Sequence, residues 1–153
     1  MKKTNNKGFS LVELIIVIAI MAILIGVLAP QYIKYVEKSR VSADKDLLDS
    51  VYNAATTAAS DPDITDIPGQ GDSQTGTTLV GAAAGSQTWS AEVLSTLGAT
   101  NFASVQAKLK SKVAKGSNIM FNIDSKGNFT VWVGASTNSN ANATGICVGA
   151  GAD

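Results

Sequence analysis

The stretch that decides the fold is KGFSLVELIIVIAIMAILIGVLAP, residues 7–30 of a chain of 153 residues. The apolar run continues from Leu14 to Ile33 without a charged residue, and a single carboxylate, Glu13, directly precedes it. At about 1.5 Å of rise per residue, a helix of this length spans the roughly 30 Å hydrocarbon core of a bilayer. We expect the helix to be retained in the membrane, because the small residue that could mark a cleavage site, Gly8, comes before the apolar run.

The start of this helix has the pattern of a capping box. Ser10 would be the N-cap, Glu13 would accept the amide N–H of Ser10, and Phe9 and Leu14 would form a hydrophobic staple. A negative charge in the first turn is also favoured by the helix dipole. Two interpretations of Glu13 therefore stay open on these residues alone: a helix cap, or a functional charge at the membrane edge.

The composition excludes several classes of function. The chain is neutral, with 12 basic and 12 acidic residues, and it contains one cysteine and no histidine. Without histidine, the usual histidine-assisted forms of serine, cysteine and zinc chemistry are excluded. A neutral chain gives no general electrostatic footprint for nucleic acid, and we expect no nucleic-acid partner. No catalytic residue, cofactor site or metal site is predicted.

The residues K-G-F-S-L-V-E-L, 7–14, resemble the start of a type IV prepilin with a class III signal: a basic leader, Gly8, Phe9, and a glutamate five residues along, counted from Phe9. The resemblance implies that residues 1–8 are a leader peptide, that a prepilin peptidase cuts between Gly8 and Phe9, and that Phe9 is then N-methylated. It also implies that Glu13 compensates the amino group of a neighbouring subunit's Phe9 during filament assembly. This role is physically reasonable, because a charge in an apolar core needs a partner.

Pro30 lies inside a helical pattern that resumes directly after it. Proline cannot donate to the carbonyl of Gly26, so we expect a kink near Gly26 and Pro30; the alternative is that Pro30 ends the helix. Apolar residues then recur every three or four positions, at Val36, Ala43, Leu47, Val51, Ala54 or Ala55, and Ala58. The opposite, charged face includes Lys38, Asp44, Lys45 and Asp49.

This periodicity predicts one helix of about 50 residues. Residues 9–33 would form its transmembrane and filament-core part, and residues 34–59 would continue it into a globular head. The resemblance implies the lollipop architecture of known pilins and a loss of helical order near residues 22–30 in the filament.

The head, residues 60–153, is predicted to have an αβ-loop at 60–117 and a β-sheet at 118–150. Helices are expected at 90–97 and 101–113, and a β-hairpin is formed by 118–124 and 129–134. A third strand is expected at 144–148. The fold class is therefore α+β, with a small antiparallel sheet packed on the long helix and with Phe121 and Trp132 in the core.

Three groups of polar residues in the head raise further possibilities. Asp61, Asp63, Asp66 and Asp72 invite a calcium site, but their spacing does not fit an EF-hand, and we expect a solvated loop. Lys108, Lys110, Lys112 and Lys115 would end the second helix, where cations suit the dipole, and a DNA- or surface-binding patch is the alternative. Cys147 has no intramolecular partner and is expected to be small and buried; many Gram-negative pilins have two cysteines here, which points to a Gram-positive or anaerobic source.

The resemblance implies a structural subunit of a type IV pilus and not an enzyme. Its partners would be further copies in a helical filament, the prepilin peptidase, the pilus assembly machinery, membrane lipid before assembly, and host or abiotic surfaces. It would begin as a single-pass prepilin in the cytoplasmic membrane and end in an extracellular pilus that serves adhesion, twitching motility or biofilm formation. A pseudopilin of a type II secretion or DNA-uptake system and a membrane-anchored binding module remain as alternatives.

Overall fold

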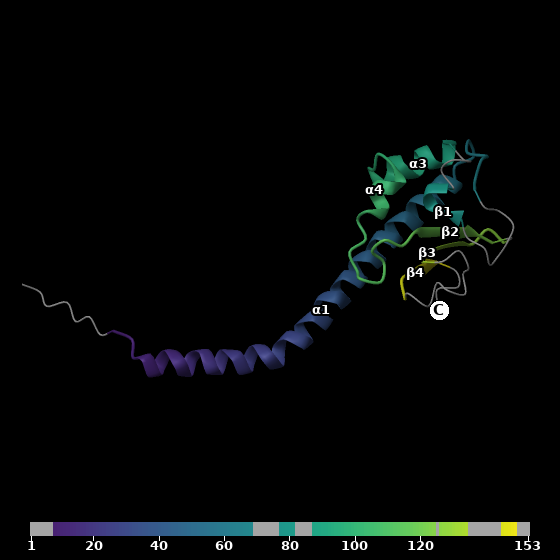
Figure 1. Cartoon of the computed structure of the whole chain (residues 1–153). Helices are drawn as coiled ribbons and strands as arrows, with labels where there is room; N and C mark the ends of the chain where they lie inside the picture. Colours follow the sequence, from purple (N-terminus) through teal and green to yellow (C-terminus); the bar gives the residue numbers. More distant parts are fainter. Residues whose placement is uncertain (1–7, 69–76, 82–86, 125, 135–144, 150–153) are drawn as a thin grey trace, which may run out of the picture. The chain divides into compact units, whose positions relative to one another are not determined.

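The structure is a computed structural model that describes residues 8–68, 77–81, 87–124, 126–134 and 145–149 (Figure 1). Its elements follow in the order α1 (Leu11–Ala59), β1 (Thr77–Thr78), α3 (Gln87–Leu97), α4 (Phe102–Gln106), β2 (Ile119–Ile123), β3 (Phe129–Val133) and β4 (Cys147–Gly149). The predicted α+β class, with a long amino-terminal helix and a small antiparallel sheet, is confirmed. The chain divides into two compact units, Met1–Val36 and Glu37–Asp153, and α1 contributes to both.

Helix α1 has 49 residues and passes through Pro30 without a break. A proline removes one backbone hydrogen bond, but the long run of helix-compatible residues on both sides keeps the helix continuous. The prediction of a single long helix is confirmed, and the alternative that Pro30 ends it is wrong. The helix stops at Ala59, where the amide of Ser60 donates to the carbonyls of Thr56 and Thr57 at 3.1 Å and Pro62 follows.

In the unit Glu37–Asp153, one face of α1 is buried in the core. Its buried residues are Asp44, Leu48, Val51, Ala54, Ala55 and Ala58. The predicted stripe is correct from Val51 onward. Before it, Leu47 is partly buried against the core and Val36 is partly buried, whereas Ala43 is exposed and the prediction is wrong there. Asp44, which was placed on the charged outer face, is 1% exposed. The buried residues of α1 recur every three or four positions, and this series begins at Asp44. A prediction from apolar residues alone passes over Asp44 and selects its neighbour Ala43 instead.

The four strands form one antiparallel sheet in the order β1-β2-β3-β4. The predicted hairpin is confirmed, with Ile119 opposite Val133 and Ile123 opposite Phe129. Asp124 closes its turn, because one carboxylate oxygen accepts the amide N–H groups of Lys126 and Asn128 at 2.8 Å each. Gly127 follows at φ +83°, a conformation that glycine adopts without a steric penalty.

The edge strands differ from the predictions. β1 lies in the segment that was predicted to be loop, and a strand of two threonines, Thr77 and Thr78, is too short to give a periodic signal. β4 begins at Cys147, and Gly145 and Ile146 precede it outside the strand. Gly149 ends β4 at φ +106°, where an added Cβ would lie 2.2 Å from the carbonyl oxygen of Phe129. The close approach of β4 to β3 therefore requires glycine at this position.

Of the two short helices predicted from the sequence, the structure confirms the extent of the first but not that of the second. α3 covers the predicted residues 90–97, whereas α4 ends at Gln106 and not near Val113. Asn101 is the N-cap of α4, and its side chain accepts the amide N–H of Ser104 at 2.8 Å. The helical periodicity after Gln106 is overridden because the backbone there donates to carboxylates of α1, as described below. The four lysines from Lys108 to Lys115 thus lie beyond the helix and do not complement its dipole.

The core of this unit joins α1, the helices α3 and α4, and one face of the sheet (Figure 1). Trp89 lies at its centre, with its ring centroid 5.0 Å from that of Phe121 and 6.3 Å from that of Phe102. Trp132 is fully buried on the other face of the sheet with Met120. The prediction that Phe121 and Trp132 are core residues is confirmed.

Candidate functional site

The first turn of α1 contains the capping contact predicted from the sequence. The amide N–H of Ser10 donates to Oε2 of Glu13 at 3.1 Å, and the amide of Leu14 donates to the Ser10 carbonyl at 3.2 Å. Ser10 directly precedes the helix, as an N-cap does. The Glu13 side chain thus satisfies one donor of the helix start with one oxygen and is exposed.

Gly8 and Phe9 lie outside the helix and are exposed. The Phe9 side chain is 87% exposed and that of Leu14 is 59% exposed, so the predicted staple between them buries little surface. A Cβ added at Gly8 would meet no atom within 4 Å. The peptide bond between Gly8 and Phe9 is therefore in non-helical backbone next to the helix start. The predicted leader residues 1–7 lie outside the described residues.

Around its whole circumference, α1 exposes large apolar side chains from Leu11 to Ile33. An 18-residue window of α1 reaches a mean hydropathy of 3.1 and none of it is buried, so by length and composition this is a helix that could cross a membrane. A helix that is apolar all round requires an apolar environment, either lipid or protein. The unit Met1–Val36 offers no such environment among its described residues.

Gly26 and Pro30 lie within this apolar part of α1, and a Cβ added at Gly26 would meet no atom within 4 Å. Pro30 has no N–H, and the carbonyl of Gly26 therefore lacks the donor that a helix normally supplies. The kink predicted at these two residues stays a prediction.

A second set of polar contacts, which the sequence did not predict, fixes the segment after α4 onto α1. The Asp44 carboxylate accepts the amide N–H groups of Lys110 and Ser111, at 2.8 Å each. One heptad earlier, Glu37 accepts the amide of Lys112 and pairs with Arg40 at 3.6 Å. We call these contacts of Asp44 and Glu37 the carboxylate clasp. The signal that could have located it is the interval of seven residues, which places both acids on the face of Leu48 and Val51.

The carboxylates of Asp61 and Asp66, in the acidic loop after α1, accept hydrogen bonds from other residues of the head. The Asp66 carboxylate accepts the hydroxyl and the amide of Thr88 and, at 3.2 Å, the amide of Trp89, so it caps α3 from 22 positions away. The Thr88 hydroxyl is the main reason why the pKa of Asp66 is lowered from its ordinary value of 3.8. Asp61 accepts the amide of Asp63 at 2.9 Å.

The calcium hypothesis receives no support from these residues. Within the part of the chain that the structure describes, no group of three acids, histidines or cysteines could hold a metal ion. Asp72 lies outside the described residues.

Cys147 is half-buried at the start of β4 and has a free thiol. The expectation that it is buried is therefore only partly met. Burial raises the pKa of this thiol above its ordinary value of 9.0.

Comparison with protein families finds a match at the amino terminus. The family described as the prokaryotic N-terminal methylation motif matches residues 3–29. The type IV major pilin protein PilA of Myxococcus xanthus is 40% identical over 59 residues, which are 39% of this chain and 27% of the relative. The type IV major fimbrial protein FimA of Dichelobacter nodosus is 50% identical over 40 residues, 26% of each chain. No solved structure matches the chain.

The amino-terminal segment therefore has the prokaryotic N-terminal methylation motif, and the chain is similar to type IV major pilins, as the resemblance of residues 7–14 indicated. The matched part spans only about a quarter of each relative. These relatives support a pilin subunit.

Proposed function

We propose that this chain is a structural subunit of a type IV pilus, processed after Gly8 and polymerised through its amino-terminal helix. The observation that carries the proposal is the arrangement at the helix start. Gly8 and Phe9 are exposed in non-helical backbone, and Glu13 lies in the first turn of the helix. A peptidase needs accessible backbone outside regular secondary structure, and the exposed, non-helical residues Gly8 and Phe9 are compatible with that requirement.

Cleavage would place a new positive amino group on Phe9, beside the positive end of the helix dipole. Glu13 uses one oxygen, Oε2, on the Ser10 amide. Its other oxygen is available to the methylated amino group of a neighbouring subunit's Phe9. The cap and the assembly role are thus compatible, because a single carboxylate serves both.

The apolar surface of α1 explains why the subunit would pass from lipid to filament. In the membrane, lipid covers the side chains from Leu11 to Ile33; in the filament, neighbouring copies cover them. An unpaired charge in such a core is strongly unfavourable, and this favours subunits whose Phe9 amino group meets a Glu13 carboxylate. Gly26 and Pro30 would let the helix adapt its path between the two environments.

In this proposal the prepilin peptidase and the pilus assembly machinery act on the chain in the cytoplasmic membrane, and the product is an extracellular filament. Adhesion, twitching motility and biofilm formation are the roles that such a filament would serve. The relatives that match are named as major pilin and major fimbrial proteins, which favours a long pilus over a pseudopilin assembly.

The test is mass spectrometry of the subunit in filaments sheared from cells, combined with electron microscopy of cells that lack the gene. We expect long filaments that vanish with the gene and a subunit that begins at methylated Phe9. A subunit that retains residues 1–8, or that is cut after Pro30, would contradict the proposal. Short filaments confined to the cell envelope would indicate a pseudopilin.

A further inference from the structure

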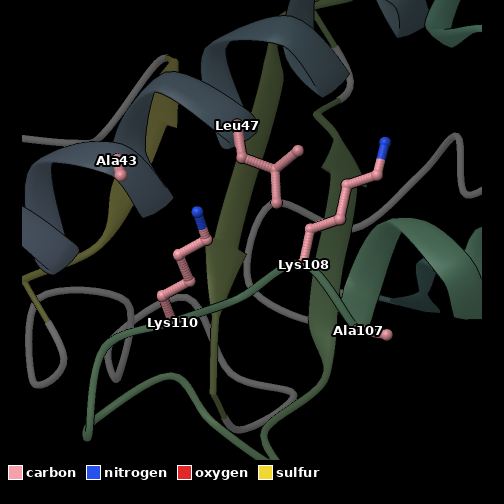
Figure 2. A pocket seen from close by; sticks show the side chains of 5 residues that line it. All are labelled: Ala43, Leu47, Ala107, Lys108 and Lys110. Carbon is pink, nitrogen blue, oxygen red and sulfur yellow. The ribbon is translucent and has the colours of Figure 1, made fainter.

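A groove lies between α1 and the segment that follows α4 in the unit Glu37–Asp153. It is open, has a volume of about 300 Å³, and is lined by Ala43, Leu47, Ala107, Lys108 and Lys110. Ala43 and Leu47 come from α1, whereas both lysine side chains extend toward α1 from the opposite side (Figure 2). The groove therefore combines an apolar wall with two cations.

The backbone fixes the direction of both lysines. Leu109 is 6% exposed and Ser111 is fully buried, whereas Lys108 and Lys110 are exposed, so successive side chains of this segment alternate between the core and the groove. Asp44 and Glu37 of α1 accept backbone N–H groups in the carboxylate clasp, and neither forms an ion pair with Lys108 or Lys110. No ion pair of Lys108 or Lys110 is recorded among the described residues. Within the described part of the chain, the groove thus presents two lysine ammonium groups that form no ion pair.

A complementary surface lies on the solvent side of α1. Asp46 and Asp49 are exposed and three residues apart, so their side chains are neighbours on the helix surface. They lie opposite the stripe formed by Asp44, Leu48 and Val51, as the period of 3.6 residues requires. Within the described part of the chain neither carboxylate has a recorded ion pair.

We propose that the groove of Lys108 and Lys110 receives Asp46 and Asp49 of a second copy of this chain. The inference rests on the proposed function, because a helical filament repeats one heterologous contact in which two different surfaces of the same chain meet. The acidic pair lies on α1, the element through which the copies would polymerise. The apolar wall of Ala43 and Leu47 would exclude water from the contact and strengthen the attraction.

The first test is charge reversal. The double variant Lys108→Glu, Lys110→Glu is expected to reduce the amount of sheared filament about tenfold, through two lost attractions and the new repulsion. The matched control, Lys115→Glu, Lys126→Glu, makes the same change in net charge at exposed lysines outside the groove and should leave the yield unchanged. Tryptophan fluorescence of each variant in detergent reports whether the head is folded.

The decisive test is rescue. Asp46→Lys, Asp49→Lys should reduce filament yield on its own, and the combined fourfold variant should restore it. A cysteine pair, Lys110→Cys with Asp49→Cys in a Cys147→Ser background, should give disulfide-linked oligomers in oxidised filaments. Lys126→Cys with Asp49→Cys should give none.

The outcomes separate this contact from the pilus proposal. Wild-type filaments that tolerate the groove reversal, or a fourfold variant that is not rescued, would overturn the contact and leave the pilus standing. Absence of wild-type filaments would overturn both. If the groove reversal instead abolishes the binding of added DNA and leaves the filament yield intact, the occupant is an anionic polymer and the second-copy contact is wrong.

Discussion

The two parts of α1 place similar side chains in opposite surroundings. In the unit Met1–Val36, Ile18 is 57% exposed, whereas in the unit Glu37–Asp153, Leu48 is fully buried. Both residues lie in the same unbroken helix, so backbone conformation does not distinguish them. The second part of α1 therefore has its packing partner within its own chain, while the apolar surface of the first part requires lipid or another protein surface.

The largest effect is expected from a substitution of Glu13, the charge at the edge of the exposed apolar part of α1. Glu13→Gln keeps an oxygen for the Ser10 amide but removes the charge, and we expect about a 100-fold loss of filaments. Quantitative microscopy and shearing measure the loss. Normal filaments with Glu13→Gln and fewer with Glu13→Ala would show that the residue is only a cap.

A direct comparison of the two parts uses Leu48→Ala and Ile18→Ala. Loss of a fully buried leucine side chain should lower the free energy of unfolding of the head by about 3 kcal/mol, whereas Ile18→Ala should leave it unchanged. Urea unfolding in detergent, followed by tryptophan fluorescence, measures the difference. Both tryptophans of the chain, Trp89 and Trp132, lie fully buried in the unit Glu37–Asp153. If the two substitutions lowered the free energy of unfolding equally, the distinction between an exposed first part and a buried second part of α1 would be wrong.

The carboxylate clasp allows a sharper test within the second part. Asp44→Ala leaves the amide N–H groups of Lys110 and Ser111 without their acceptor, and we expect a loss of about 2 kcal/mol in the same unfolding assay. Asp49→Ala, on the exposed face of the same helix, is the control and should change stability by less than about 0.5 kcal/mol. If the Asp44 contacts contribute nothing to stability, the two variants will have the same free energy of unfolding.

The smallest effect is expected on the stability of the head at acidic pH. The pKa of Asp66 is lowered mainly by the Thr88 hydroxyl, and that of Asp124 mainly by the Asn128 amide. Their contribution to stability is complete above the ordinary pKa of 3.8 and is lost as the pH falls below that value toward the lowered ones. Thermal unfolding scans from pH 6 to pH 3 should show a shallower decline for Asp66→Asn than for the wild type. An identical decline would exclude Asp66 as a contributor.

The sequence predicted most where one physical signal dominates. Uninterrupted apolarity indicated α1, and the alternation of β-branched and aromatic residues around the turn at Asp124 indicated the hairpin. The spacing from Gly8 to Glu13 identified the type of amino-terminal segment. Each of these signals is local, and each was sufficient without knowledge of the rest of the chain.

What could not be predicted depends on contacts between distant residues. In the sequence, Asp44 resembles a surface residue, because the backbone amides that donate to its carboxylate, those of Lys110 and Ser111, are 66 and 67 positions away. The same two hydrogen bonds replace helical ones after Gln106, where α4 ends. Asp66 became a cap for α3 only through Thr88. In each case a carboxylate accepts hydrogen bonds from residues far away in the sequence, and a local sequence pattern cannot identify those donors.

The clasp also bears on the rate at which the head loses its structure. Because Asp44 meets partners 66 and 67 positions away, its contacts can form only after the intervening chain has closed a long loop. Interactions made late in folding are absent from the transition state and act chiefly by slowing unfolding. Asp44 is therefore expected to slow the unfolding of the head more than it speeds its folding.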